Sequence, residues 1–255
     1  MKYKGIIFDL DGTAIPNRPE GMPSQRLISV IAKVKDMIPV AVATGRPIAM
    51  CRDILKALGL STPCIISGGT QIIDPCTEEI LWEKMLSIEQ SEEVMKVARK
   101  FDYVVYCSDD RSASQAKTHR VAKKERMIYL WAVAEADVPI ILQLLSTITD
   151  AKALLVPSWV AGTIDIHVTH KDATKSHSLA LWLDHLKLNG KDVVGFGDGN
   201  NDLPIFELIG YKVAMQNASE DLKKAADLIA PSVEEDGVAQ IIEELFIPSF
   251  TEIKV

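Results

Sequence analysis

The chain has 255 residues, of which 47% are hydrophobic and 25% charged, so it can bury a core in one large domain or two smaller ones. Its net charge of −7 argues against a nucleic-acid or anionic-membrane partner, because phosphate groups attract clustered Lys and Arg. The sequence contains neither a long apolar run nor a signal-peptide cleavage pattern, so we expect no membrane span and no secretion.

The first part of the chain alternates short apolar strands with amphipathic helices. Strands are expected at residues 5–9, 39–43 and 64–67. Ser24 is the expected N-cap of a first helix, and a second helix should begin after Pro47 and end at Gly59. This alternation is typical of an α/β protein with a parallel sheet.

The pattern changes after about residue 84. Ser87 and Gln90 form a capping-box pair at the start of a helix that should reach Phe101. Two strands, a helix and two more strands follow, at residues 103–107, 127–133, 138–148, 153–156 and 163–168. Such an α-β-β-α-β-β order predicts an antiparallel sheet with both helices on one face, inserted at about residues 85–171.

The alternation of strands and helices resumes at Lys175, with strands expected at residues 193–197, 212–214 and 228–230. The four cysteines, Cys51, Cys64, Cys76 and Cys107, form no CxxC pair. A chain of this size needs no disulfides, so reduced thiols and a cytoplasmic location are expected. His and Cys do not occur at zinc-ligand spacing, so no zinc site is predicted.

Polar residues follow the predicted core strands at their carboxyl ends, where open α/β sheets bind ligands. These residues are Asp9 and Asp11, Thr44, Gly45 and Arg46, Lys175 at the start of a helix, and Asp198, Asn201 and Asp202. Crowded carboxylates repel one another unless a cation lies among them, and their hard oxygens suit Mg²⁺. Because Mg²⁺ prefers few carboxylates plus a substrate phosphate, the cluster predicts a site for a phosphorylated ligand.

Such a cluster contains the groups that phosphoryl transfer requires. One carboxylate can attack phosphorus, and a second, two residues later, can protonate the leaving oxygen and then activate water. A lysine and a threonine hydroxyl would offset the charge that develops on the equatorial oxygens.

The segments DLDGT and ATGR, the isolated Lys175 and GDGNND, in this order, resemble the four motifs of the haloacid dehalogenase superfamily. The insert between the second and third motifs resembles the cap of its Cof-type phosphatases, which have a type IIB cap. The resemblance covers nearly the whole chain. It implies a Rossmann-like core formed by residues 1–84 and 172–255, with an α+β cap domain at residues 85–171.

The resemblance also implies roles for the polar residues. Asp9 corresponds to the nucleophile that forms an aspartyl phosphate, and Asp11 to the general acid/base. Lys175 corresponds to the cation that steadies the nucleophile and the phosphoryl group. Thr44, Gly45 and Arg46 correspond to the phosphate-binding segment. The implied Mg²⁺ ligands are Asp9, Asp11 through its backbone carbonyl, Asp198 and Asp202, with Asn201 as a supporting residue.

Several residues leave alternatives open. Arg46 contacts phosphate or forms a surface ion pair. The basic residues Arg111, Lys117, His119, Arg120, Lys123, Lys124 and Arg126 form a solvated loop or reach over the active site. Trp159 stacks on a ligand or packs against a neighbour, and His167 faces solvent on its strand or belongs to the site. Gly68-Gly69-Thr70 stands where many relatives have Asn-Gly-Ala, and Ser176 where they have Gly.

The expected function is Mg²⁺-dependent hydrolysis of a phosphomonoester, with a small phosphorylated metabolite such as a sugar phosphate as the substrate. The alternatives are a phosphosugar mutase, which has similar motifs, and a protein that binds a phosphorylated ligand without turnover. The Asp9 and Asp11 pair speaks against the binding protein, because binding alone requires neither an acyl acceptor nor an adjacent acid/base. The sequence does not predict the oligomeric state.

Overall fold

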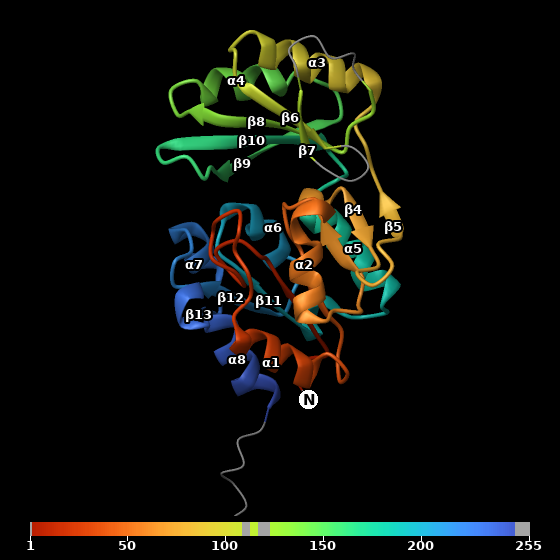
Figure 1. Cartoon of the computed structure of the whole chain (residues 1–255), viewed down its shortest axis with the longest axis vertical. Coiled ribbons are helices and arrows are strands. Elements are labelled where there is room, and N and C mark those ends of the chain that lie inside the picture. The colour runs from red at the N-terminus through yellow and green to blue at the C-terminus, as the bar shows by residue number, and fades with distance from the viewer. Residues whose placement is uncertain (1, 109–112, 117–122, 248–255) are drawn as a thin grey trace, which may run out of the picture.

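The computed structural model describes residues 2–108, 113–116 and 123–247 (Figure 1). Its central layer is a parallel sheet with the strand order β13 (Leu228–Ala230), β12 (Tyr211–Met215), β11 (Val193–Gly197), β1 (Gly5–Phe8) and β2 (Val40–Val42). Every residue of β1 is buried, since strands of a parallel sheet are covered on both faces. The predicted α/β fold is confirmed.

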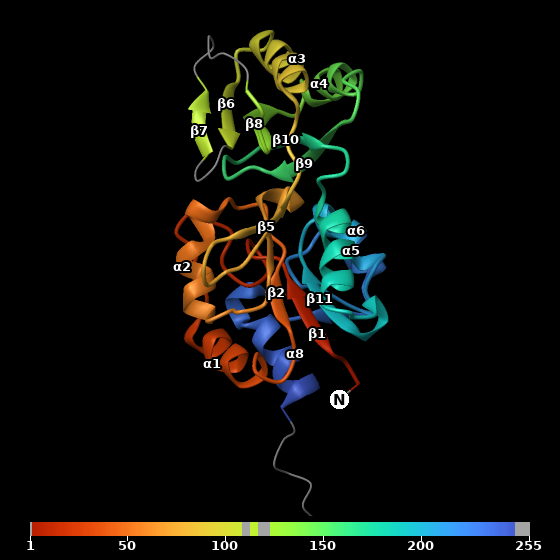
Figure 2. The same ribbon diagram turned by 90° about the vertical axis from the view of Figure 1, so that its right-hand side faces the viewer.

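Helices lie on both sides of the core sheet (Figure 2). On one side are α1 (Gln25–Val34), α2 (Ile48–Leu58) and α8 (Gly237–Phe246), and on the other are α5 (Lys175–His185) and α6 (Leu203–Phe206), beside which α7 (Glu220–Ala225) packs. The Ser24 hydroxyl accepts the Leu27 N–H at 3.0 Å, which confirms the predicted cap of α1. Gly59 ends α2 with a left-handed backbone, as predicted.

A small antiparallel sheet was not predicted, although one of its strands was. It contains β3 (Cys64–Ile66), β4 (Gln71–Ile73) and β5 (Ile80–Glu83), and a bridge between Ala43 and Ile65 links it to the end of β2. Sequence analysis identified only β3. The other two strands are short, and β5 carries three consecutive apolar residues instead of alternating apolar and polar ones.

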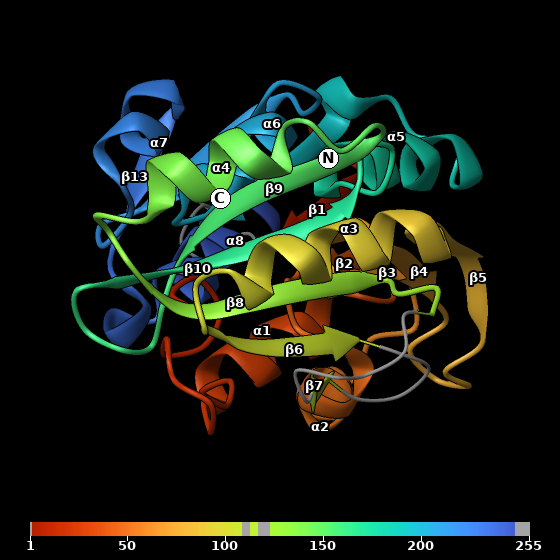
Figure 3. The same cartoon turned by 90° about the horizontal axis from the view of Figure 1, so that it is seen from above.

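The second large sheet is antiparallel, with the strand order β7 (Ala113–Ala116), β6 (Val104–Ser108), β8 (Met127–Ala134), β10 (Thr163–His170) and β9 (Ala151–Pro157). Helices α3 (Ile88–Arg99) and α4 (Val138–Leu145) cover the face that points away from the core (Figures 1 and 3). The predicted capping box of Ser87 and Gln90 begins α3, which ends at Arg99 and does not reach Phe101. Strand β7 was not predicted, because its small, polar sequence shows no apolar alternation.

Buried apolar side chains form two separate clusters. The larger surrounds the parallel sheet and includes Trp182, whose indole N–H donates to the Pro63 carbonyl oxygen at 2.7 Å. The smaller lies between the antiparallel sheet and helices α3 and α4. From this separation we propose that residues 85–171 fold as an inserted cap domain, with residues 1–84 and 172–255 as the core domain.

Within the described residues, no helix has both the length and the apolar character that a membrane crossing requires. Cys51, Cys64 and Cys76 are free thiols, and of the four cysteines only Cys76 is exposed.

Candidate active site

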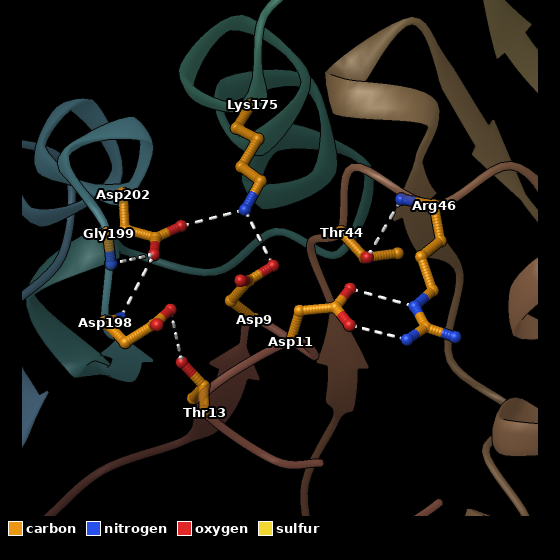
Figure 4. Close-up of polar contacts among 9 residues, drawn as sticks. All are labelled: Asp9, Asp11, Thr13, Thr44, Arg46, Lys175, Asp198, Gly199 and Asp202. Atoms are coloured by element: carbon orange, nitrogen blue, oxygen red, sulfur yellow. Dashed lines mark hydrogen bonds and ion pairs between the residues drawn. The ribbon is translucent and has the colours of Figure 1, made fainter. Parts of the chain in front are cut away.

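Three carboxylates from separate segments meet at the carboxyl ends of β1 and β11 (Figure 4). Asp9 directly follows β1, Asp198 directly follows β11, and Asp202 ends the 3₁₀ turn Asn200–Asp202. Each residue offers a carboxylate oxygen, and these three oxygens lie within 4.8 Å of one another. The parallel arrangement of the two strands brings together residues that are almost 190 positions apart in sequence.

Lys175 lies between two of these carboxylates. It begins helix α5, and its buried ammonium group donates to Asp9 Oδ1 at 2.7 Å and to Asp202 Oδ1 at 2.8 Å. Burial lowers the pKa of Lys175, but the charges of Asp202 and Asp9 outweigh this effect and raise it above the ordinary lysine value. The side chain therefore remains a cation.

Asp9 and Asp198 have raised pKa values. Burial raises the pKa of Asp9 to about 7, against the opposing charge of Lys175 and with a smaller contribution from Asp202. Burial also raises the pKa of Asp198 to about 8, and the charges of Asp9 and Asp202 add to the effect. The single positive charge of Lys175 thus does not neutralise the negative charge of three carboxylates. A divalent cation bound by their hard oxygens would remove the remaining repulsion between them.

The loop that carries Asp9 is fixed against the loop that carries Asp198. Gly12 has φ +74°, and a Cβ at this position would lie 2.1 Å from Asp198 Oδ2. The Thr13 hydroxyl donates to Asp198 Oδ1 at 3.2 Å. The Asn217 amide donates to the Gly12 carbonyl oxygen at 2.7 Å. Thr13 was not singled out, although it belongs to the DLDGT segment.

Asp202 also organises its own turn. Its Oδ2 accepts the backbone N–H groups of Asp198 and Gly199, both at 3.2 Å. Asp202 is 1% exposed, so these bonds and the one from Lys175 satisfy a carboxylate that solvent does not reach. Asn201 lies in the same turn, and its side chain makes no hydrogen bond within the described residues.

Thr44, which is buried, and Gly45, which is half-buried, form a loop after β2. The Thr44 hydroxyl accepts the Arg46 backbone N–H at 3.1 Å, and no acceptor for its own hydrogen lies among the described residues. Gly45 lies below the cap, because a Cβ placed on it would be 4.0 Å from His167 Cε1. The loop thus faces the space between the two sheets.

Arg46 does not form a surface ion pair, so that alternative was wrong. Its side chain is 4% exposed and donates hydrogen bonds to both carboxylate oxygens of Asp11, at 2.8 Å and 2.5 Å (Figure 4). The guanidinium lies under the loop at residues 16–22, two carbonyl oxygens of which it also binds. The ATGR segment gives no sign of this burial, which depends on contacts distant in sequence.

Two cap side chains lie at the interface with the core. The Trp159 indole N–H donates to Asn17 Oδ1 at 2.9 Å, which ties the loop between β9 and β10 to the core. His167 stacks edge to face with Tyr129 at 4.6 Å and faces the core, so the alternative of a solvent-facing side chain was wrong. Burial, aided by the charge of Lys175, lowers the pKa of His167 to about 4, so the ring is neutral.

The basic stretch of the cap is not simply a solvated loop. Arg126 is 1% exposed, and its guanidinium donates twice to Glu83 Oε2 on β5. Lys123 and Lys124 are also described, whereas Arg111, Lys117, His119 and Arg120 lie outside the described residues.

Gly69 places the start of helix α5. It has φ +96°, and a Cβ on it would lie 2.2 Å from the Thr174 carbonyl carbon and 2.3 Å from the Lys175 nitrogen. The Ser178 hydroxyl on α5 donates to the Gly69 carbonyl oxygen, and this hydrogen bond also holds the helix against Gly69. A side chain at position 69 would therefore push Lys175 away from Asp9 and Asp202.

We expect Gly69→Ala to lower the free energy of unfolding by about 2–4 kcal/mol, through backbone strain together with the clash. Urea unfolding measures this loss, and turnover should fall as well because Lys175 moves. Gly162→Ala is the matched control, since Gly162 has φ +76° but no atom lies within 4 Å of its added Cβ. Equal losses in the two variants would mean that the contact with α5 is unimportant.

Comparison with known proteins agrees with this geometry. The family model for haloacid dehalogenase-like hydrolases matches residues 6–139 and 112–242. A phosphoglycolate phosphatase of Archaeoglobus fulgidus is 28% identical over 96% of this chain and 98% of its own. A 5-amino-6-(5-phospho-D-ribitylamino)uracil phosphatase of Bacillus subtilis is 24% identical over 95% of both chains.

Solved structures give the same result for the fold. A haloacid dehalogenase-like hydrolase from B. subtilis superposes with a TM-score of 0.82 at 18% identity, covering 95% of this chain and 99% of that chain. The family match spans nearly the whole chain, and the two relatives described above, which align over almost its full length, are phosphatases by name. The chain therefore belongs to the haloacid dehalogenase-like hydrolases, and within them to the Cof-type phosphatases.

Proposed function

We propose that this phosphatase hydrolyses a phosphomonoester with Mg²⁺ through an aspartyl phosphate on Asp9. The supporting observation is the position of Asp9, which lies between the Lys175 ammonium group and the carboxylates of Asp198 and Asp202. A carboxylate beside a lysine and a metal can approach an anionic phosphoryl group, because both cations offset the repulsion.

The residues have the following proposed roles. Thr44 donates its hydroxyl hydrogen to a phosphate oxygen, and the backbone at Gly45 leaves room for the phosphate. Asp9 attacks phosphorus while the bond to the leaving oxygen breaks, and the Asp11 carboxyl group gives its proton to that oxygen. Asp11 then takes a proton from water, which attacks the phosphorus and releases phosphate and free Asp9.

Mg²⁺ would be held by the carboxylates of Asp9, Asp198 and Asp202 together with the Asp11 backbone carbonyl, with Asn201 in support. All of these donors are oxygens, as the ion prefers. When bound, Mg²⁺ supplies positive charge to the transferring phosphoryl group. Lys175 orients Asp9, and the buried surroundings exclude bulk water from the carboxylates.

The proposed substrate is a small phosphorylated metabolite such as a sugar phosphate. The relatives named above are phosphatases of small molecules by name, and the chain matches them over almost its full length. We propose that the leaving group meets the cap strand that carries His167, because a Cβ placed on Gly45 would lie 4.0 Å from His167 Cε1. The neutral His167 ring offers hydrogen bonds to hydroxyl groups without a charge.

Turnover in ¹⁸O-labelled water tests this function. With Mg²⁺ and p-nitrophenyl phosphate we expect each phosphate released, including that of the first turnover, to carry one labelled oxygen, and Asp9 to stay unlabelled, because water attacks the aspartyl phosphate at phosphorus. EDTA should abolish turnover. Activity that persists in EDTA contradicts the metal proposal, and transfer of the phosphoryl group to a sugar instead of water indicates a mutase.

We expect Mg²⁺ to raise the melting temperature, and to raise it more at pH 8 than at pH 6. Asp9 and Asp198 have pKa values of about 7 and about 8, above the ordinary value of about 3.9, so they bind protons more tightly in the folded state. Their contribution to stability is complete below about pH 4 and is lost as pH rises through the folded values. Mg²⁺ binds the ionised carboxylates, so the rise in melting temperature that it causes grows as Asp9 and Asp198 lose their protons.

Differential scanning fluorimetry with millimolar Mg²⁺ at the two pH values measures this effect. Asp198→Asn should remove most of the Mg²⁺-dependent shift, because it deletes a ligand. A shift that is equal at both pH values, or that persists in the variant, would place the ion elsewhere.

A further inference from the structure

The guanidinium of Arg46 has no N–H left for a phosphate group. Nε donates to Asp11 Oδ2 at 2.8 Å, and Nη2 donates to Asp11 Oδ1 at 2.5 Å and to the Arg18 carbonyl oxygen at 2.7 Å. Nη1 donates to the carbonyl oxygens of Pro19 at 3.0 Å and Met50 at 3.3 Å. A guanidinium has five N–H groups, so every one of them has an acceptor within the protein.

The contact between Arg46 and Asp11 has a defined geometry. Two parallel N–H···O bonds join the planar guanidinium to both oxygens of the carboxylate, which fixes the orientation of the carboxyl group. The Arg46 side chain is 4% exposed and that of Asp11 is 23% exposed. In Figure 4 the Asp11 carboxylate points toward Arg46, whereas the Asp9 carboxylate points toward Lys175.

The cap also reaches this pair. The Trp159 ring lies over the guanidinium, with its centroid 5.8 Å from Arg46 Cζ, within the range of a cation–π contact. The Trp159 indole N–H is bonded to Asn17, in the same loop that supplies the carbonyl groups of Arg18 and Pro19. The cap loop therefore covers one side of the guanidinium, and reduced access of water strengthens the ion pair.

We propose that Arg46 is a positioning residue for Asp11 and not a phosphate ligand. It holds the Asp11 carboxyl group under the cap loop and so governs proton transfer to the leaving oxygen and from the attacking water. This inference rests on the proposed function, in which Asp11 is the general acid and base. As the phosphorus–oxygen bond breaks, the Asp11 proton moves to the leaving oxygen, and the carboxylate that remains is the form that accepts both Arg46 bonds.

Substrates whose leaving groups differ in basicity show whether Arg46 positions Asp11 or binds phosphate. p-Nitrophenyl phosphate leaves as a weakly basic phenolate that needs little protonation, whereas benzyl phosphate, of similar size, leaves as a strongly basic alkoxide. Arg46→Lys keeps the positive charge but cannot form the two-pronged contact. We expect it to lower the single-turnover rate of benzyl alcohol release from benzyl phosphate about 100-fold, and that of p-nitrophenol release from p-nitrophenyl phosphate less than about 5-fold.

Inhibition by inorganic phosphate provides the second readout. Because Arg46 does not contact phosphate in this proposal, the inhibition constant of Arg46→Lys should stay within about 3-fold of the wild-type value. If the variant slows both esters equally and weakens phosphate inhibition, Arg46 is a phosphate ligand and the inference is overturned. An equal loss on both esters with unchanged phosphate inhibition indicates a general structural role and overturns it as well.

The Asp11→Asn background tests whether Arg46 acts through Asp11. If Arg46 works by positioning that carboxyl group, Arg46→Lys should cause no further loss on benzyl phosphate in this background. Turnover of benzyl phosphate at an undiminished rate in Asp11→Asn would instead refute the role of Asp11 in the proposed function. The matched control is Arg52→Lys, since Arg52 forms the same two-pronged contact with Glu78 on the surface and should leave both esters unaffected.

Discussion

Asp9→Asn should lower kcat for p-nitrophenyl phosphate by at least about a thousand-fold while the protein remains folded. The amide has the shape of the carboxylate but cannot form an aspartyl phosphate. The side-chain oxygen at position 9 can still accept a bond from Lys175, which also keeps its bond to Asp202. Removing one of three crowded carboxylates relieves repulsion, so the melting temperature without Mg²⁺ should be equal or higher at neutral pH.

Asp36→Asn is the matched control, because it removes the same charge from an exposed position. It should retain wild-type turnover, which separates the chemical effect from a change in net charge. Wild-type enzyme trapped during a single turnover of substrate with a labelled phosphoryl group should carry that group on Asp9. Asp9→Asn should carry none. Full activity of Asp9→Asn in a folded protein would refute the covalent mechanism.

Sequence predicted the elements whose signals are local. The caps at Ser24 and Ser87 and the end of α2 at Gly59 depend on neighbours within a few residues, so they could be recognised directly. The gathering of Asp9, Asp198 and Asp202 was also predictable, because parallel strands place their carboxyl ends at one edge of a sheet.

The surroundings of Arg46 and His167 were not predictable in this way. Arg46 is buried by carbonyl groups of a loop at residues 16–22 and by the cap residue Trp159, far from it in sequence. His167 alternates with apolar neighbours as a solvent-facing strand residue does, but its open sheet face lies over the core. Whether such a face meets water or a second domain depends on tertiary placement, which the periodicity does not encode.

Lys175→Met should lower the free energy of unfolding by about 3–5 kcal/mol at pH 8, because it leaves two buried carboxylates without their cation. The loss should shrink toward pH 5, since Asp9 has a pKa of about 7 beside Lys175 and a higher one without it, so protonation removes the buried charge. Turnover should fall about 10²- to 10³-fold, because the side chain no longer offsets charge on the phosphoryl group.

Urea unfolding at the two pH values measures the effect, and Lys171→Met provides the control. Lys171 also pairs with an aspartate, Asp150, at 2.8 Å, but the two side chains are 55% and 44% exposed. Water already solvates this pair, so its loss should leave the free energy of unfolding nearly unchanged at either pH. Similar losses in the two variants would mean that burial does not amplify the Lys175 contacts. A loss at Lys175 that does not change with pH would mean that unpaired carboxylates are not its cause.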